Sequence, residues 1–309
     1  MTKETTQQVN FRVFRFNADE DYLPYYQNYN MEVTSKEVIL DILNKIRDQD
    51  SSFSYSRNCS LSSCEDCAVK INGRPTLACK ESVKAMIELF GSELTIEPLS
   101  KKRAIRDMII DKSDFLEKYD SIKPYNISNG NEYLKESNEM QELSEIDSCV
   151  TCGVCYYSCP VVEVNEDFLG PAAFVKAYYF ETGVRDETHR QRIEDLHREK
   201  EGLWDCVKCY ECAEVCPSGV DPIGKMTKLH NMLYKEGDAT SSVATSHIAN
   251  IKDSIGKHGI LAQLGSLSNL SATMKMYKKG KTAKPWSVPA SGNLDEIQKL
   301  IESSSTSKF

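Results

Sequence analysis

The sequence lacks any apolar run long enough to span a bilayer, and its first ten residues are too polar for the hydrophobic segment of a secretory signal. It also lacks an excess of basic residues, because 46 Asp and Glu outnumber 38 Lys and Arg for a formal net charge of −8. This charge argues against a nucleic-acid partner. We therefore expect no membrane anchor and no leader in this chain, which would reach a membrane only through another subunit.

The sequence also has little that could serve catalysis. It contains no nucleophile–base pair, no glycine-rich phosphate loop and no evident clamp for a substrate carboxylate. The five histidines are scattered outside any motif, so we interpret each as a surface or core residue rather than a ligand: His189, His197, His230, His247 and His258. We predict no catalytic residue in this chain.

What the chain does contain is cysteine in close clusters. All 12 cysteines fall into three motifs, and none is left over. Such clustered spacing is typical of metal ligation rather than of disulfide pairing. The length of 309 residues is enough for two domains that each have a core.

A motif of the form C-x2-C-x2-C-x3-C-P occurs twice, at Cys149–Pro160 and Cys206–Pro217. Bacterial two-cluster ferredoxins use this motif to bind cubane [4Fe–4S] clusters, and the fourth cysteine of each copy binds the neighbouring cluster. The motif therefore predicts two ligand sets, which are Cys149, Cys152, Cys155 and Cys216 for the first cluster and Cys159, Cys206, Cys209 and Cys212 for the second.

A pair of zinc ribbons is the competing interpretation of these cysteines. Structural zinc takes four ligands from two C-x2-C pairs, whereas each copy here has three evenly spaced cysteines followed by a Cys-Pro. The repeated pattern favours two iron–sulfur clusters over zinc.

Nearer the N-terminus, a third motif has the spacing of plant-type [2Fe–2S] ferredoxins and consists of Cys59, Cys64, Cys67 and Cys79. The surrounding sequence predicts strands at 11–16, 30–33, 69–73 and 94–96, with an Asn-Gly turn after the third. A capping box at Thr34–Glu37 predicts the start of a helix that buries Val38, Ile39, Ile42, Leu43 and Ile46. This order of elements indicates a β-grasp ferredoxin domain and makes zinc or chance the weaker interpretation.

The fold class that follows is α+β. We predict a β-grasp [2Fe–2S] ferredoxin domain over residues 8–125, with a helix at 103–118, and a polar linker at 126–131. An all-α ferredoxin-like domain with two cubane clusters is predicted over 131–240, with helices at 170–180, 185–201 and 222–235. A helical extension follows over 241–309. We expect its leucines at 261–274 to form a packing stripe. We expect its lysines at 275–284 to form a solvated face or to contact an anionic partner or lipid. Residues 303–308 are expected to be a disordered end.

A [2Fe–2S] domain followed by a double-cluster domain resembles the iron–sulfur subunit of succinate dehydrogenases and fumarate reductases, over about residues 10–236. Three further stretches look like signatures of that family, namely Arg106–Asp111 with Ile122–Tyr125 (its inter-domain helix), Phe168–Ala172 and Cys216–Pro222. The resemblance implies an oxidoreductase subunit with one [2Fe–2S] and two [4Fe–4S] clusters. Its implied partners are an FAD-containing flavoprotein, which acts on succinate or fumarate, and a membrane-side, quinone-linked subunit.

The sequence departs from most of that family at the third motif. Most members lack a cysteine at the position of Cys209 and hold a [3Fe–4S] cluster there. In this respect the chain is similar to a branch of archaeal-type, methylmenaquinol-linked and thiol-linked fumarate reductases, whose membrane-side partner is often cysteine-rich. The family's quinone-binding Trp and His are matched by Val164 and Val207. Ser62 and Glu65 stand where the family usually has glycine, which lets backbone amides approach the cluster.

The alternative function is that of an iron–sulfur subunit of a heterodisulfide-reductase-like or glycolate-oxidase-like flavin-linked complex. Such subunits usually lack a [2Fe–2S] domain, so the motif from Cys59 to Cys79 favours the first interpretation. We expect the chain to be held at the cytoplasmic membrane by its partners. The cytoplasmic face is favoured unless the flavoprotein carries a twin-arginine signal, which would place the complex on the periplasmic face.

Overall fold

The computed structural model describes residues 6–125, 137–182, 195–196, 202–236, 243–258 and 293–306. The chain divides into two units, residues 1–231 and 232–309, and each is described by itself. In chain order the elements are β1 (Thr6–Arg15), β2 (Tyr25–Thr34), α1 (Ile39–Gln49), β3 (Ala68–Ile71), β4 (Arg74–Leu77), α2 (Val83–Phe90), β5 (Glu93–Pro98), β6 (Ala104–Arg106), β7 (Ile109–Ile110), α3 (Ser113–Ser121), α4 (Ser137–Asp147), α5 (Val154–Tyr157), α6 (Pro160–Val164), α7 (Pro171–Glu181), η1 (Leu203–Asp205), α9 (Glu211–Glu214), α10 (Pro222–Glu236), α11 (Val243–His258) and α13 (Leu294–Thr306).

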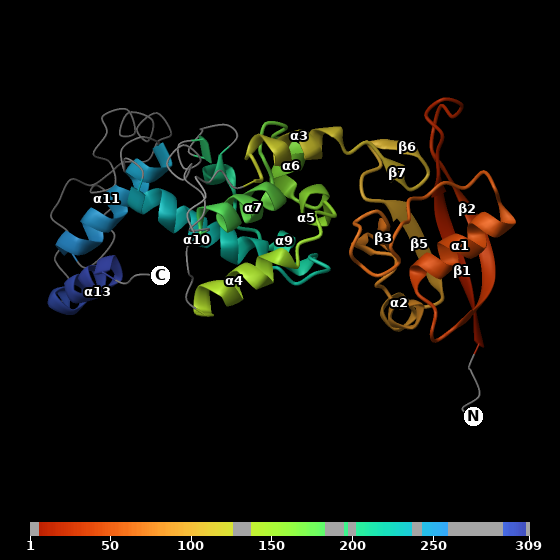
Figure 1. The fold of residues 1–309 in the computed structure, drawn as a ribbon, viewed down its shortest axis with the longest axis horizontal. Helices are drawn as coiled ribbons and strands as arrows, with labels where there is room; N and C mark the ends of the chain where they lie inside the picture. Colours follow the sequence, from red (N-terminus) through yellow and green to blue (C-terminus); the bar gives the residue numbers. More distant parts are fainter. Residues whose placement is uncertain are drawn as a thin grey trace, which may run out of the picture. The chain divides into compact units, whose positions relative to one another are not determined.

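The N-terminal part of the first unit is a mixed sheet in the order β2-β1-β5-β3-β4 (Figure 1). β1 pairs antiparallel with β2 and parallel with β5, so Phe11 lies between Tyr29 and Leu94. β3 joins the other side of β5 and pairs antiparallel with β4. This arrangement, with α1 packed against the sheet, is the predicted β-grasp ferredoxin fold.

Local sequence explains most of these elements. Alternate residues of β1, including Val9, Phe11 and Val13, are buried under α1, because successive side chains of a strand point to opposite faces. Of the predicted helix face, Ile39, Ile42, Leu43 and Ile46 are buried in this core, whereas Val38 precedes α1 and is only partly buried. The predicted Asn-Gly turn between β3 and β4 is also confirmed, with positive φ at Asn72 (47°) and Gly73 (82°).

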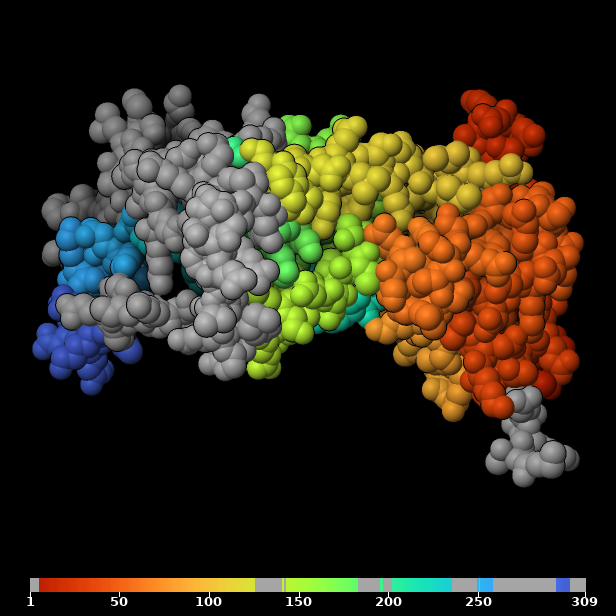
Figure 2. Space-filling view, viewed as in Figure 1, coloured from red at the N-terminus to blue at the C-terminus, as the bar shows by residue number. Residues whose placement is uncertain are grey.

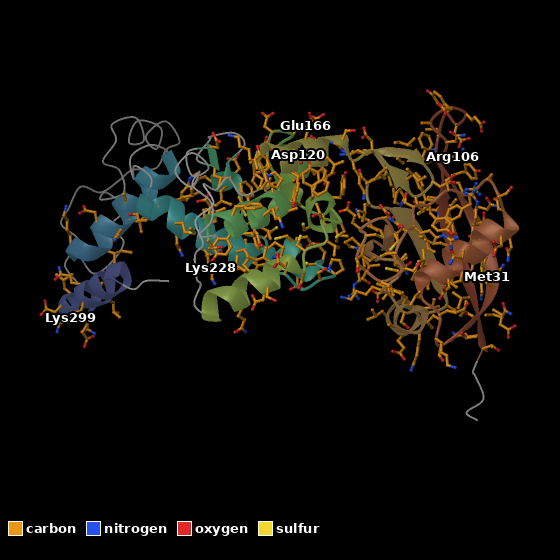
Figure 3. All side chains as sticks on the ribbon, viewed as in Figure 1. Met31, Arg106, Asp120, Glu166, Lys228 and Lys299 are labelled. Carbon is orange, nitrogen blue, oxygen red and sulfur yellow. The ribbon has the colours of Figure 1, made fainter. Side chains whose placement is uncertain are left out.

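The predicted helix at 103–118 is wrong. Residues 104–110 form the β6–β7 hairpin, marked by Arg106 in Figure 3, and only α3 is helical. The reason is Asp107, which turns the chain with a φ of 48° and accepts hydrogen bonds from the backbone N–H groups of Phe16 and Ser54. The part of the family signature read as an inter-domain helix is therefore mostly a hairpin. Ile105 in the hairpin is 49% exposed, whereas Phe115 in α3 is buried.

Three smaller predictions also need correction. β2 begins at Tyr25, five residues before the predicted strand at 30–33. The Thr34–Glu37 pair closes a turn, with Thr34 N–H donating to Glu37 at 2.6 Å, and α1 starts only at Ile39. Residues 303–306 are helical rather than disordered, because α13 continues to Thr306.

A loop between β1 and β2 stands out from the sheet as the dark red projection in Figure 2. Its apolar residues Tyr22 and Leu23 are 94% and 69% exposed. A bridge between Asn17 and Arg106 ties the start of this loop to the β6–β7 hairpin. The loop is therefore anchored at one end and exposes two apolar side chains.

The regular elements in the described remainder of the first unit are helices, as predicted. α7 begins at the predicted Gly170-Pro171, and α10 matches the predicted helix at 222–235. The backbone of Gly170 has a φ of 84°, and a Cβ there would lie 2.5 Å from the ring of Tyr156. Glycine is therefore required where α7 packs against the loop that carries the first cysteine motif.

In the second unit, α11 packs against α13, and Gln298 Nε2 donates to the carbonyl of Gly256 at 2.9 Å. Four predicted segments lie outside the described residues: the linker at 126–131, nearly all of the helix at 185–201, the leucine stripe at 261–274 and the lysine run at 275–284. None of the helices in the described parts of the chain is both long and apolar enough to cross a membrane.

Candidate iron–sulfur centres

The plant-type motif lies on the loop between α1 and β3, and its last cysteine follows β4. Cys59, Cys64 and Cys67 sit on the loop, and Cys79 returns next to them because β4 pairs with β3. The backbone N–H of Cys79 donates to Cys67 Sγ at 3.4 Å. The local fold thus gathers the four thiols that the sequence predicts for the [2Fe–2S] cluster.

Backbone amides of this loop point at the sulfurs. The N–H groups of Leu61 and Ser63 donate to Cys59 Sγ, both at 3.3 Å, and that of Ser62 donates to Cys79 Sγ at 3.2 Å. Left-handed backbone turns the amides inward, with φ of 60° at Ser62 and 61° at Glu65. These are two positions where the family usually has glycine, so this chain keeps the conformation at a cost of roughly 1–2 kcal/mol per residue.

Ser62 adds a contact that glycine could not make. Its hydroxyl lies 3.6 Å from Cys79 Sγ. An iron-bound thiolate has no proton to give, so the hydroxyl would be the donor once a cluster is bound. Hydrogen bonds to the sulfurs are one of the factors that set a cluster's reduction potential.

The two cubane motifs use the same backbone conformation. In the first, Thr151 (φ 56°) and Gly153 (φ 77°) precede the short helix α5, which carries Cys155. In the second, Lys208 (φ 54°) and Tyr210 (φ 67°) precede α9, which carries Cys212. The repeated sequence spacing therefore folds into a repeated loop, with an exposed tyrosine held left-handed where the first copy has glycine.

The thiols of these motifs gather in two groups that exchange their fourth cysteine. Cys149, Cys152, Cys155 and Cys216 line one small cavity, walled by apolar residues that include Val175 and Val220. Around Cys212, the thiols of Cys206, Cys159 and Cys209 are close enough to raise its pKa. The members of these two groups are the cysteines that the sequence assigns to each cubane, and their role as ligands stays a prediction.

Burial dominates the ionisation of these thiols. Burial, together with the neighbouring thiols, raises the pKa of Cys155 well above the usual thiol value, that of Cys152 to about 11 and that of Cys212 to about 12. Such thiols stay protonated at neutral pH unless a cation takes the place of the proton. The donor set therefore fits iron, which would bind these sulfurs as thiolates.

Within the [2Fe–2S] loop, the thiol pKa values are shifted in opposite directions. Burial raises the pKa of Cys67 to about 12, whereas the backbone N–H of Leu61 and further hydrogen bonds lower the pKa of the half-buried Cys59 to about 7. One side of this site is thus dry and the other faces solvent, as in a cluster held at the edge of a domain.

The two regions meet in one apolar core. Cys152 and Val154 of the first cubane loop belong to the same buried cluster as the β-grasp core, and Cys79 and Val215 pack against it. α5 and α9 in turn pack against each other, which brings the two cubane motifs together. The three cysteine groups therefore follow one another, with the first cubane group in the middle.

Sequence reasoning missed a polar cluster beside the first cubane loop. The Tyr156 hydroxyl donates to the Asp114 carboxylate, Lys118 Nζ donates to that hydroxyl at 2.8 Å, and Arg103 pairs with Asp114 at 2.9 Å. These contacts hold α5 against α3 and the hairpin. The only sequence signal was the Tyr-Tyr pair inside the motif, and it gives no partner.

The cubane group around Cys212 lies nearest the surface. Cys209 is exposed, and Val164, five residues after Cys159, and Val207, directly after Cys206, are 83% and 67% exposed. By contrast, Cys152 at the matching position of the first motif is buried. This second cubane group is therefore the one that another protein could approach.

No three or more His, Cys, Asp or Glu side chains in the described part of the chain lie close enough together to hold a single metal ion. A zinc site needs four ligands at about 2.0–2.3 Å from one centre. A cubane needs its four thiolates around a larger object than one ion, and the repeated motif spacing is what favours clusters over zinc ribbons.

Comparison with known families agrees with this division of the chain. Residues 10–117 match the family described as "2Fe-2S iron-sulfur cluster binding domain", and residues 145–220 match the "4Fe-4S dicluster domain". The first match contains the plant-type cysteine group, and the second contains both cubane groups. Neither match reaches the second unit.

Whole-chain comparisons point the same way. The chain is 32% identical over 231 residues to the fumarate reductase iron-sulfur subunit of Haemophilus influenzae, covering 69% of this chain and 88% of that protein. It is 31% identical over 227 residues to the mitochondrial succinate dehydrogenase [ubiquinone] iron-sulfur subunit of Dictyostelium discoideum, covering 69% and 78%. Its fold is similar to a chain of the Mycobacterium smegmatis Sdh1 complex in the apo form, with a TM-score of 0.66, 24% identity and coverage of 76% and 100%.

Proposed function

Since the chain belongs to the family of succinate dehydrogenase and fumarate reductase iron–sulfur subunits, we propose that it carries electrons between the flavoprotein of such a complex and a membrane-side, quinone-linked partner. The observation that carries the proposal is the arrangement of the cysteines. One group lies in the β-grasp domain, one in the shared core and one beside exposed residues. A chain built this way offers electrons an entry, an interior step and an exit.

When bound, one [2Fe–2S] and two [4Fe–4S] clusters supply one-electron redox chemistry. The chain's own residues provide the ligands and the surroundings. Cys59, Cys64, Cys67 and Cys79 would hold the first cluster, Cys149, Cys152, Cys155 and Cys216 the second, and Cys159, Cys206, Cys209 and Cys212 the third. Backbone N–H groups stabilise the thiolates, as that of Val220 does at Cys216 Sγ (3.4 Å), and the apolar core keeps water out.

The overall reaction divides between subunits. Oxidation of succinate to fumarate releases two electrons and two protons, and reduction of a quinone takes up the same numbers, so this chain need carry only electrons. The substrate and its proton transfers belong to the FAD-containing partner. The chain would reach the membrane through its partners.

We expect the isolated chain to show no turnover. Anaerobically purified and flavin-free, it should be brown and should neither oxidise succinate nor reduce fumarate, whereas activity should appear when the flavoprotein and the membrane-side partner are added. Cys67→Ser should cut electron flow in the assembled complex by about 100-fold or more, because a ligand of the first cluster is lost. Activity of the chain alone, or a colourless preparation without iron, would contradict the proposal.

We further propose that electrons leave through the third cluster to a cysteine-rich partner, as in the branch of the family that this chain resembles in having Cys209. Val164 and Val207 stand at the two positions where the resemblance places quinone-binding polar residues, and valine cannot donate a hydrogen bond to a quinone oxygen. The exposure of Val164, Val207 and Cys209 supports a surface that a protein covers. On this proposal quinone binds in the partner or beyond it.

A quinone photoprobe on the intact complex tests this exit route. We expect labelling confined to the partner subunit, with none on this chain. Labelling of peptides that contain Val164 or Val207 would indicate a quinone pocket rebuilt from other side chains of this chain, and it would overturn this second proposal without affecting the first.

A further inference from the structure

Lys80 connects two cysteine groups that are far apart in sequence. It directly follows Cys79, the last cysteine of the [2Fe–2S] group, in the turn before α2. Its Nζ donates a hydrogen bond to the carbonyl of Pro217, 137 residues away in sequence. Pro217 directly follows Cys216, which lines the first cubane cavity. A short run of covalent bonds and one hydrogen bond thus joins a ligand of one site to a ligand of the next.

The surroundings fix both ends of this link. On one side, Lys80 N–H donates to the carbonyl of Leu77 at 2.9 Å, which sets its place after β4. On the other side, Gly219 N–H donates to the Cys216 carbonyl at 3.2 Å, and Val220 N–H donates to Cys216 Sγ. The apolar core shared by Cys79 and Cys152 excludes water but has no directional contacts. The ammonium group adds a directional contact to this part of the junction.

The charge of Lys80 also matters. An iron–sulfur cluster with four thiolate ligands carries net negative charge, which grows when an electron is added, so a nearby cation favours the reduced form. Lys80 is next in sequence to a ligand of one site and bonds to the residue next to a ligand of the other. Its charge consequently acts on both sites.

We propose that Lys80 is a positioning residue for electron transfer between the [2Fe–2S] site and the first [4Fe–4S] site. It holds Cys79 against the Cys216–Pro217 segment, and its charge raises the reduction potentials of both clusters. This inference rests on the proposed function, since it requires both clusters to be bound and to exchange electrons.

Lys102 provides a matched control. Its Nζ pairs with Glu163 Oε1 at 3.1 Å, so it also joins the β-grasp domain to the double-cluster domain through a single ammonium group. The side chains of both partners are mostly exposed. Glu163 does not adjoin a ligand of the two sites in question, because it lies four residues after Cys159. Lys102→Met removes a cross-domain ion pair without removing charge from the junction of those sites.

The experiment compares Lys80→Met, Lys80→Arg and Lys102→Met in the intact complex, by redox titration followed by EPR. For Lys80→Met we expect full iron content and a lower potential of both the [2Fe–2S] and the first [4Fe–4S] cluster. The reduced-to-oxidised ratio at a fixed ambient potential should fall about threefold, which is about 30 mV for a one-electron couple. The potential of the third cluster should change least, and Lys80→Arg, which keeps the charge and a donor, should stay close to the original protein.

Rapid reduction by succinate gives an independent readout, because Lys80→Met should slow the appearance of reduced [4Fe–4S] signal relative to reduced [2Fe–2S]. The inference is overturned if Lys80→Met titrates like the original protein, or if Lys102→Met shifts the same two potentials equally. If the complex with the unmodified chain lacks these clusters, the proposed function is overturned as well. Failure of the Lys80 inference alone is therefore distinguishable from failure of the proposed function.

Discussion

Replacing Cys209 with serine or alanine is expected to convert the third cluster from a four-iron to a three-iron form. Cys209 is the exposed member of its group, and the three other thiols of that group, Cys159, Cys206 and Cys212, are at least partly buried. Each iron of a cubane has one cysteine ligand. The iron bound to Cys209 would lose that ligand at the exposed side of the cluster and would dissociate into solvent. Iron should therefore fall from about ten to about nine per chain, and a three-iron EPR signal should appear in the oxidised protein.

The alanine variant removes the ambiguity of a serine oxygen that could itself bind iron. Cys152→Ser is the matched control, because Cys152 holds the same place in the first motif but is buried in the enclosed cavity. It should perturb the first cubane signal and leave the third unchanged. A strong three-iron signal in the anaerobically prepared original protein, with iron near nine, would show that Cys209 does not bind iron.

Replacing Arg15 with methionine should destabilise the β-grasp domain by about 3–5 kcal/mol, because it leaves a carboxylate buried without its partner. Arg15 is only 4% exposed and donates to Asp107 Oδ1 at 2.9 Å and Asp50 Oδ2 at 2.6 Å. Its remaining donors reach the side chains of Gln27, Tyr29 and Ser52. One guanidinium group thus joins β1, β2, the end of α1 and the hairpin turn.

Anaerobic urea titration, followed by loss of the visible circular dichroism of the bound [2Fe–2S] cluster, measures this effect. Lys84→Met is the control, since Lys84 pairs with Glu88 at 3.7 Å on the exposed face of α2 in the same domain. Surface pairs of this kind contribute about 0–1 kcal/mol, so the control should be nearly unchanged. Equal midpoints for the two variants would mean that the Arg15 cluster does not stabilise the domain.

The Arg15 cluster also has an expected pH dependence. Hydrogen bonds from Ser52 and Arg15 hold the pKa of Asp50 below its usual value of about 3.9. A carboxyl whose folded pKa is depressed contributes stability that is complete above the unfolded pKa and is lost as the pH falls through the folded pKa. The difference between the original protein and Arg15→Met should therefore be constant near neutral pH and shrink below about pH 4.

Several features were determined by the sequence alone because they depend on neighbours in the chain. The spacing of the cysteines specified the cluster types, since a loop of fixed length can place only certain sulfurs around one centre. The alternation of apolar residues in β1 and the apolar face of α1 predicted these elements, because the spacing of buried side chains within one strand or helix depends only on nearby residues. The Asn72-Gly73 turn followed from backbone conformations that those two residues readily adopt.

The tertiary structure decided what depends on residues far apart in sequence. The helix predicted at 103–118 gave way to a hairpin because Asp107 meets Arg15 and two backbone amides, and no local pattern reveals a partner 92 residues away. The same holds for Lys80, whose bond to Pro217 exists only once the two domains share a core. It holds too for the difference between the buried Cys152 and the exposed Cys209, because two copies of one motif have the same spacing, and packing alone determines which of them faces solvent.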